Sequence, residues 1–143
     1  MKQLTVNIEG KALDWALAVA LGKQYNCHPT VQDEIVWMPT KSIVFGTTNT
    51  EINGNNHVPF DYTDPALCLG LIKQYRANID QVEHAPKVQV TIWYEITDSD
   101  GEDFDAVSAI GDTIEQAVAR CVCLMHLGEW VDIPKELCSM DVL

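Results

Sequence analysis

The segment that decides the fold is residues 88–134, VQVTIWYEITDSDGEDFDAVSAIGDTIEQAVARCVCLMHLGEWVDIP. Apolar and polar residues alternate from Val88 to Ile96, and this alternation is typical of a strand with one buried face. A turn at residues 98–101 is followed by a second strand-like segment, Phe104–Ile110. The two segments together predict an antiparallel hairpin.

The hairpin leads into the best-defined helix of the chain. The sequence DTIE at Asp112–Glu115 is typical of a capping box, and apolar residues recur behind it at helical spacing. Gly128 is expected to end this helix. Trp130–Ile133 is expected to be extended up to Pro134, and residues 138–143 are expected to form a loose end.

Trp93 lies on the face of the predicted hairpin opposite to its aliphatic residues. It either covers a second layer of structure, which we favour, or forms an exposed aromatic platform. The acidic residues around the turn lack the order of a calcium-binding loop and are expected to be solvated. These are Asp98, Asp100, Glu102, Asp103 and Asp105.

A second helix is predicted for Lys11–Leu21, with Gly22 at its end. Apolar residues cover almost its whole circumference, which indicates a central position in the fold. Asp14 is the exception. In the simpler interpretation Asp14 shares a solvated strip with Lys11, and in the alternative it lies at the edge of a pocket beside Trp15.

The middle of the chain is less regular. Strands are predicted at 34–38 and 42–46, and residues 47–57 are expected to form a loop because they are rich in Asn, Thr and Gly. His28 and His57 lie in predicted loops, and neither has a second ligand at metal-binding spacing. We therefore expect no metal site.

A third helix is expected to begin at Asp64 and Pro65, because Asp caps free backbone N–H groups and Pro is well tolerated at the first helical position. Lys73 and Arg76 near its end would complement the helix dipole, which is the simpler explanation of these residues. Gly70 in its middle would allow another backbone or a ligand to approach closely.

The chain has 143 residues, which suits one compact domain. Its 21 acidic and nine basic residues produce a net charge of −12, which argues against direct binding to nucleic acid.

No apolar run approaches the roughly 18 residues of a membrane span, and the N-terminus lacks a secretion signal, so a cytoplasmic location is expected. The five cysteines, without CxxC spacing, are expected to be reduced core thiols.

Helices interspersed with mainly antiparallel strands predict an α+β fold, in which two or three helices cover a small sheet within the single domain 1–143. We expect the two tryptophan-bearing ends of the chain, with Trp15 and Trp130, to pack around one hydrophobic centre. The sequence contains no nucleophile elbow, phosphate-binding loop, dinucleotide fingerprint or zinc-protease motif. Catalysis is therefore disfavoured, and no cofactor is expected.

Several segments resemble the NinX-like proteins of lambdoid phages, which are small accessory proteins of unassigned biochemistry. The matching residues are Gly10, Ala12–Ala16 and Ala18, then Tyr62–Asp64 and Ala66, then the helical residues Ala117, Arg120 and Cys121, and in the tail Leu127–Glu129, Val131, Ile133–Pro134 and Glu136–Leu137. The middle departs from the family, because the family follows Thr-Asp with Trp-Ala-Gln-Gly-Gly whereas this chain has Pro65–Leu69. The resemblance implies a phage protein in the cytoplasm of the host cell.

The favoured function is a non-catalytic binder that sequesters a small host molecule, with a nucleotide-derived defence signal as the preferred class. Aromatic rings and Arg suit bases and phosphates. The expected ligand-binding residues are Asp14, Trp15, Tyr62, Asp64, Arg76 and Arg120. The alternatives are an acidic protein that inhibits a basic host protein and an enzyme acting on a small metabolite. Exposed tryptophans would also permit a homodimer.

Overall fold

The structure is a computed structural model that describes residues 1–23, 26–39, 50–52, 55–98 and 101–138. It has the α+β fold expected from the sequence, in one domain. The elements follow the chain in this order: β1 (Lys2–Leu4), the short 3-10 turn η1 (Thr5–Asn7), α1 (Gly10–Gly22), β2 (Thr30–Gln32), β3 (Ile35–Pro39), β4 (Thr50–Ile52), β5 (Asn55–Pro59), α2 (Pro65–Tyr75), β6 (Asn78–Gln81), β7 (Val88–Asp98), β8 (Gly101–Gly111), α3 (Ile114–Leu127), β9 (Trp130–Asp132) and η3 (Lys135–Leu137).

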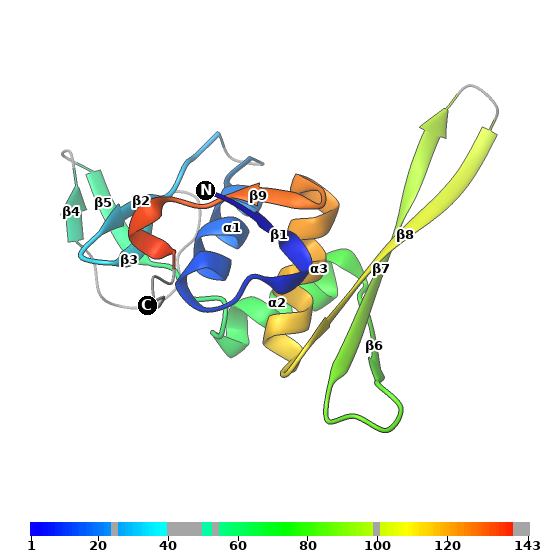
Figure 1. Ribbon diagram of the computed structural model, residues 1–143. Coiled ribbons are helices and arrows are strands. Elements are labelled where there is room, and N and C mark those ends of the chain that lie inside the picture. The colour runs from blue at the N-terminus through cyan, green and yellow to red at the C-terminus, as the bar shows by residue number, and fades with distance from the viewer. Residues whose placement is uncertain (24–25, 40–49, 53–54, 99–100, 139–143) are drawn as a thin grey trace.

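The strands are divided among three small antiparallel sheets (Figure 1). One sheet pairs β1 with β9, a second has the order β2-β3-β5-β4, and a third has the order β6-β7-β8. The first sheet joins the two ends of the described chain. The helices lie between the second and third sheets.

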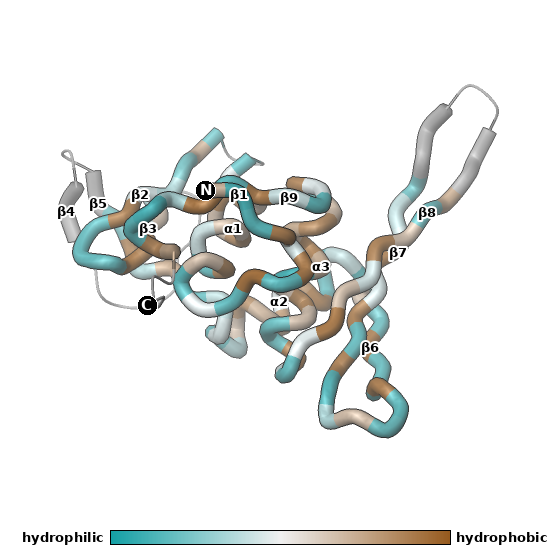
Figure 2. The backbone as a smooth tube through the Cα atoms, viewed as in Figure 1, coloured by the Kyte–Doolittle hydropathy of each residue, from teal (hydrophilic) through white to brown (hydrophobic). Residues whose placement is uncertain are grey.

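Helix α1 lies at the centre, as its nearly uniform apolar surface predicts. Leu13, Ala16 and Leu17 are completely buried, and α1 packs against both α3 and β3. Helix α3 in turn packs against β7 and β8, and its buried Cys121 thiol donates to the carbonyl oxygens of Val90 at 3.5 Å and Val107 at 3.3 Å. Figure 2 shows hydrophobic residues recurring along α1 and α3 and along β7 where it passes α3. Burial of these apolar side chains is the main stabilising term of the fold.

Two helices begin at or next to the caps that the sequence indicates. Asp64 caps α2 by accepting a hydrogen bond from the N–H of Ala66 at 2.9 Å. The cap of α3 lies one residue later than predicted, at Thr113, whose Oγ1 accepts from the N–H of Gln116 at 3.1 Å. The side chain of Gln116, rather than that of Glu115, makes the return hydrogen bond, and it accepts from the N–H of Asp112, the residue before the cap, at 2.8 Å.

The expected loop at 47–57 is wrong in part, because residues 50–52 and 55–59 form the hairpin β4–β5. Asn and Gly suggested turns, but pairing of β5 with β3 satisfies the backbone of this segment and buries His57. The strand at 34–38 is confirmed as β3. The strand predicted at 42–46 lies outside the described residues.

The hairpin β7–β8 is confirmed, with paired residues from Val88 opposite Gly111 to Asp98 opposite Gly101. Its first part packs on α3, and its far ends extend away from the helices (Figure 1). The favoured placement of Trp93 beneath a second layer is wrong, because its side chain is 58% exposed. The helices pack on the opposite, aliphatic face, where Val90 and Ile92 are buried.

Pairing of β1 with β9 closes the fold. The buried Thr5 donates its hydroxyl to the carbonyl of Gly128 at 2.6 Å and its N–H to the carbonyl of Glu129 at 2.8 Å. The two tryptophan-bearing ends thus pack around one centre, as expected. Cys138 is also buried, whereas residues 139–143 lie outside the described part of the chain, and the loose end there stays a prediction.

Candidate functional site

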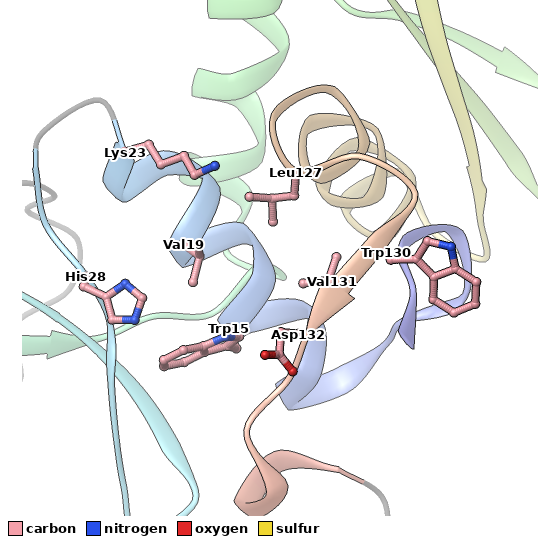
Figure 3. Close-up of a pocket in the computed structure, with 8 residues that line it drawn as sticks. All are labelled: Trp15, Val19, Lys23, His28, Leu127, Trp130, Val131 and Asp132. Carbon is pink, nitrogen blue, oxygen red and sulfur yellow. The ribbon is translucent and has the colours of Figure 1, made fainter. Parts of the chain in front are cut away.

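A cleft of about 360 Å³ lies between α1 and the strand that follows α3. Figure 3 shows that its walls come from both ends of the chain and from the segment after α1. The lining residues are Trp15, Val19, Lys23, His28, Leu127, Trp130, Val131 and Asp132.

The α1 wall follows from helical spacing. Trp15 and Val19 lie four residues apart and Lys23 follows after another four, at the C-cap of α1, so the three side chains lie along one strip. Trp15 is half-buried against the core, and Lys23 is exposed. The strip therefore changes from aromatic to aliphatic to cationic along the cleft.

Cys27 lies against the end of α1, and the next residue, His28, lies against Trp15. The N–H of Cys27 donates to the carbonyl of Gly22 at 3.0 Å, and a Cβ at Gly22 would lie only 2.3 Å from the oxygen of Cys27. Only glycine fits this close approach. The His28 ring meets the Trp15 ring edge to face, with centroids 5.3 Å apart and an interplanar angle of 87°.

The opposite wall is aliphatic with one carboxylate. Leu127 ends α3, and Val131 points inward from β9 and is buried. Asp132 accepts a hydrogen bond from the N-terminal amino group of Met1 at 2.9 Å, which offsets its charge. Trp130 contributes a 54% exposed side chain at the rim.

Lys23 is the cation of the cleft, and none of the ion pairs found among the described residues includes it. Its charge also acts on His126, whose Nε2 lies 2.8 Å from the hydroxyl of Tyr75. Burial, and then Lys23, lower the pKa of His126. A neutral imidazole is therefore favoured there.

Asp14 lies neither on a solvated strip nor at the edge of this cleft. Its side chain is 5% exposed, and its Oδ1 accepts the backbone N–H of Tyr62 at 2.8 Å. Burial raises the pKa of Asp14 to about 7, although that hydrogen bond opposes the rise. The prediction that Asp14 and Lys11 share a solvated strip is wrong, because Asp14 points from α1 toward the segment before α2 while Lys11 remains exposed.

Tyr62 lies beside Asp14, and Arg120 is close enough to act on the Tyr62 phenol, but none of the three lines the Trp15 cleft. Burial raises the pKa of the Tyr62 phenol, and a hydrogen bond with the Gln116 side chain opposes that rise. The guanidinium of Arg120 donates to the carbonyls of Ile8 at 2.9 Å and Ile110 at 2.8 Å. These contacts tie the start of α1 to α3 and β8.

Asp64 and Arg76 lie at opposite ends of α2. Asp64 is the helix cap described above, and Arg76 is the exposed residue that ends the helix in a left-handed conformation, with φ 51°. Of the six residues expected from the sequence, the structure places only Trp15 in the cleft. Lys23 could have been found from its helical spacing to Trp15, but His28 and Val131 reach the cleft only through tertiary contacts.

Within the described part of the chain, no group of three or more His, Cys, Asp or Glu side chains is arranged to hold a metal ion. All five cysteines are free thiols, and four of them are buried. None of the helices in the described ranges has the length and apolar character needed to cross a bilayer.

A scan against models of known protein families found no match to this chain, and neither did a search of curated proteins. The resemblance to NinX-like proteins therefore stays a prediction from the matching segments.

Proposed function

We propose that this protein is a non-catalytic binder that holds a small aromatic anion in the Trp15 cleft, with a single nucleotide as the preferred class. The observation that supports this proposal is the strip on α1, where the ring of Trp15 leads through Val19 to the ammonium of Lys23. An aromatic face followed by a cation matches a base followed by a phosphate.

Each part of the cleft has a role in this proposal. A base that stacks on an indole ring contributes about 1–3 kcal/mol, and Lys binds phosphate as a point charge. Val19 and Leu127 would exclude water from the base. The cleft volume of about 360 Å³ lies at the small end of ligand sites, which favours one base with one phosphate over a dinucleotide.

In the cell, the proposed role of the protein is to bind this nucleotide and keep it from its other targets. The resemblance to phage accessory proteins suggests that the captured molecule is a host signal, whose removal protects the phage. The net charge of −12 does not oppose this, because binding depends on the local field of Lys23 while Asp132 is paired with an amino group.

The test compares Lys23→Glu with Lys11→Glu, because both lysines are exposed on or next to α1 and the charge change is identical. Binding of AMP, GMP, CMP and UMP is measured by calorimetry and by the quenching of tryptophan emission. The cleft proposal predicts that at least one nucleotide binds wild type, that Lys23→Glu weakens it about tenfold or more, and that Lys11→Glu changes little.

Trp15→Leu provides the second arm of the test, with circular dichroism to confirm that the variant folds. Loss of stacking should weaken nucleotide binding by about tenfold or more. Equal affinities in wild type and Lys23→Glu, or no binding of any of the four nucleotides at millimolar concentration, would refute the proposal.

A further inference from the structure

The β7–β8 hairpin carries an exposed aromatic face that the cleft does not use. Because side chains alternate along a strand, one face of the hairpin holds Val90, Ile92 and Ala109, which are buried against α3. The opposite face holds Trp93, which is 58% exposed, and Phe104, which is 64% exposed. Large apolar side chains exposed next to one another mark an interaction surface more often than isolated ones do.

The two aromatic residues form one patch. Trp93 pairs with Ala106, and on the next rung of the same face Glu95 pairs with Phe104. Trp93 and Phe104 are therefore diagonal neighbours across the strands, a distance that aromatic side chains bridge. Ala106 is small, so both rings can be reached from solvent.

The free edge of the hairpin is less available than its face. The N–H of Ala106 donates to Oδ1 of Asp105 at 2.8 Å, and the carbonyl of Ile110 accepts from Arg120 at 2.8 Å. Both groups belong to β8, the outer strand of its sheet, and would otherwise pair with an added strand. A partner is thus expected to bind the aromatic face rather than extend the sheet.

The negative charge of the hairpin indicates that its partner carries a basic surface. Residues 88–111 contain six acidic residues and no basic residue. Glu95 lies opposite Phe104 in the exposed face itself. A complementary surface would be basic and would offer an apolar pocket for the rings. A second copy is a poor fit, because the chain as a whole has 21 acidic and nine basic residues.

We propose that the Trp93–Phe104 face of the hairpin is a docking surface for a basic protein, with the aromatic rings as anchors and the surrounding carboxylates as steering charges. This surface lies outside the Trp15 cleft, so the two proposals stand or fall separately. The far ends of β7 and β8 extend away from the helices (Figure 1), which lets them reach a concave partner surface.

The test places the photo-reactive residue p-benzoylphenylalanine at position 93 or, as a matched control, at position 130. Trp93 and Trp130 are both tryptophans, with exposures of 58% and 54%, but Trp130 lies on β9. After illumination of cells that produce the protein, position 93 should yield an adduct with a protein whose own isoelectric point is basic. The photo-reactive residue at position 130 should yield no such adduct. Glu95→Lys, combined with the photo-reactive residue at position 93, should abolish the adduct.

The identified partner is then purified and its affinity measured with wild type and with Phe104→Thr, which keeps a residue suited to a strand. A loss of about tenfold or more is expected, with tighter binding at low salt. The proposal is overturned by equal adducts at both positions, by an adduct with a second copy of this chain, by an acidic partner, or by no adduct at position 93.

Discussion

At the scale of single residues, Asp14 is the least expected feature of the molecule. A carboxyl group in the core costs free energy when it is ionised, because it leaves water for a poorly polarisable environment. The N–H of Tyr62, 2.8 Å from Oδ1, recovers only part of that cost. Asp14 therefore joins α1 to the segment before α2 at the expense of stability at neutral and higher pH.

Asp14→Asn should be more stable than wild type at pH 8, because Asn retains an oxygen for Tyr62 and carries no charge. The folded pKa of Asp14 is about 7 and its usual value is 3.8, so the free energy of unfolding of wild type should fall as pH rises from about 4 to 7. Above that window the difference from Asp14→Asn should reach roughly 4 kcal/mol, and near pH 4 the two should converge. Urea unfolding between pH 4 and 8 measures this, and the exposed Asp80→Asn should follow the wild-type profile.

At the scale of elements, the junction between β8 and α3 determines how the hairpin sits on the helices. Gly111 ends β8, and a Cβ at this position would lie 2.5 Å from the backbone nitrogen of Ala117. The helix backbone cannot yield as a flexible side chain could. The exposed Gly70 in α2 is the opposite case, because a Cβ there would meet none of the described atoms within 4 Å. The close approach expected at Gly70 is thus not present within the described fold.

Gly111→Ala and Gly70→Ala make the same chemical change and should have opposite effects. Gly111→Ala should lower the free energy of unfolding by about 1–3 kcal/mol, because α3 must shift away from β8. Gly70→Ala should raise it by about 1 kcal/mol, since alanine favours the helix interior. Thermal unfolding of both variants provides the comparison, and a stabilised Gly111→Ala would show that the junction is not close-packed.

At the scale of the whole molecule, stability depends on contacts between the two ends of the chain. Thr5 is completely buried and bonds to Gly128 and Glu129, more than 120 residues later in the sequence. The β1–β9 pair covers α1 beside the cleft, so the wall that includes Val131 depends on this closure.

Thr5→Val keeps the side-chain volume and the backbone N–H but leaves the carbonyl of Gly128 without its hydroxyl donor. We expect a loss of about 1–3 kcal/mol in the free energy of unfolding, because an unpaired buried polar group keeps its desolvation cost. Thr63→Val, at an exposed position, should change stability by no more than about 0.5 kcal/mol. Equal stability of Thr5→Val and wild type in urea would show that water replaces the hydroxyl.

The sequence was sufficient for the features that depend on local spacing. Helix periodicity and the cap at Asp64 placed all three described α-helices closely, with the cap of α3 one residue later than predicted, and alternation placed the β7–β8 hairpin. Local spacing was insufficient for β4 and β5. Strand β5, which begins with two Asn residues, acquires strand structure through pairing with β3, and β4 acquires it through pairing with β5, rather than through their own propensity.

The candidate site shows the same division. Trp15, Val19 and Lys23 share one strip because a helix repeats every 3.6 residues, which can be read in the sequence. The burial of Asp14, the position of His28 above Trp15 and the wall from Val131 depend on how elements far apart in the chain pack together. Burial and cleft shape are properties of neighbours in space, and a one-dimensional pattern specifies only neighbours along the chain.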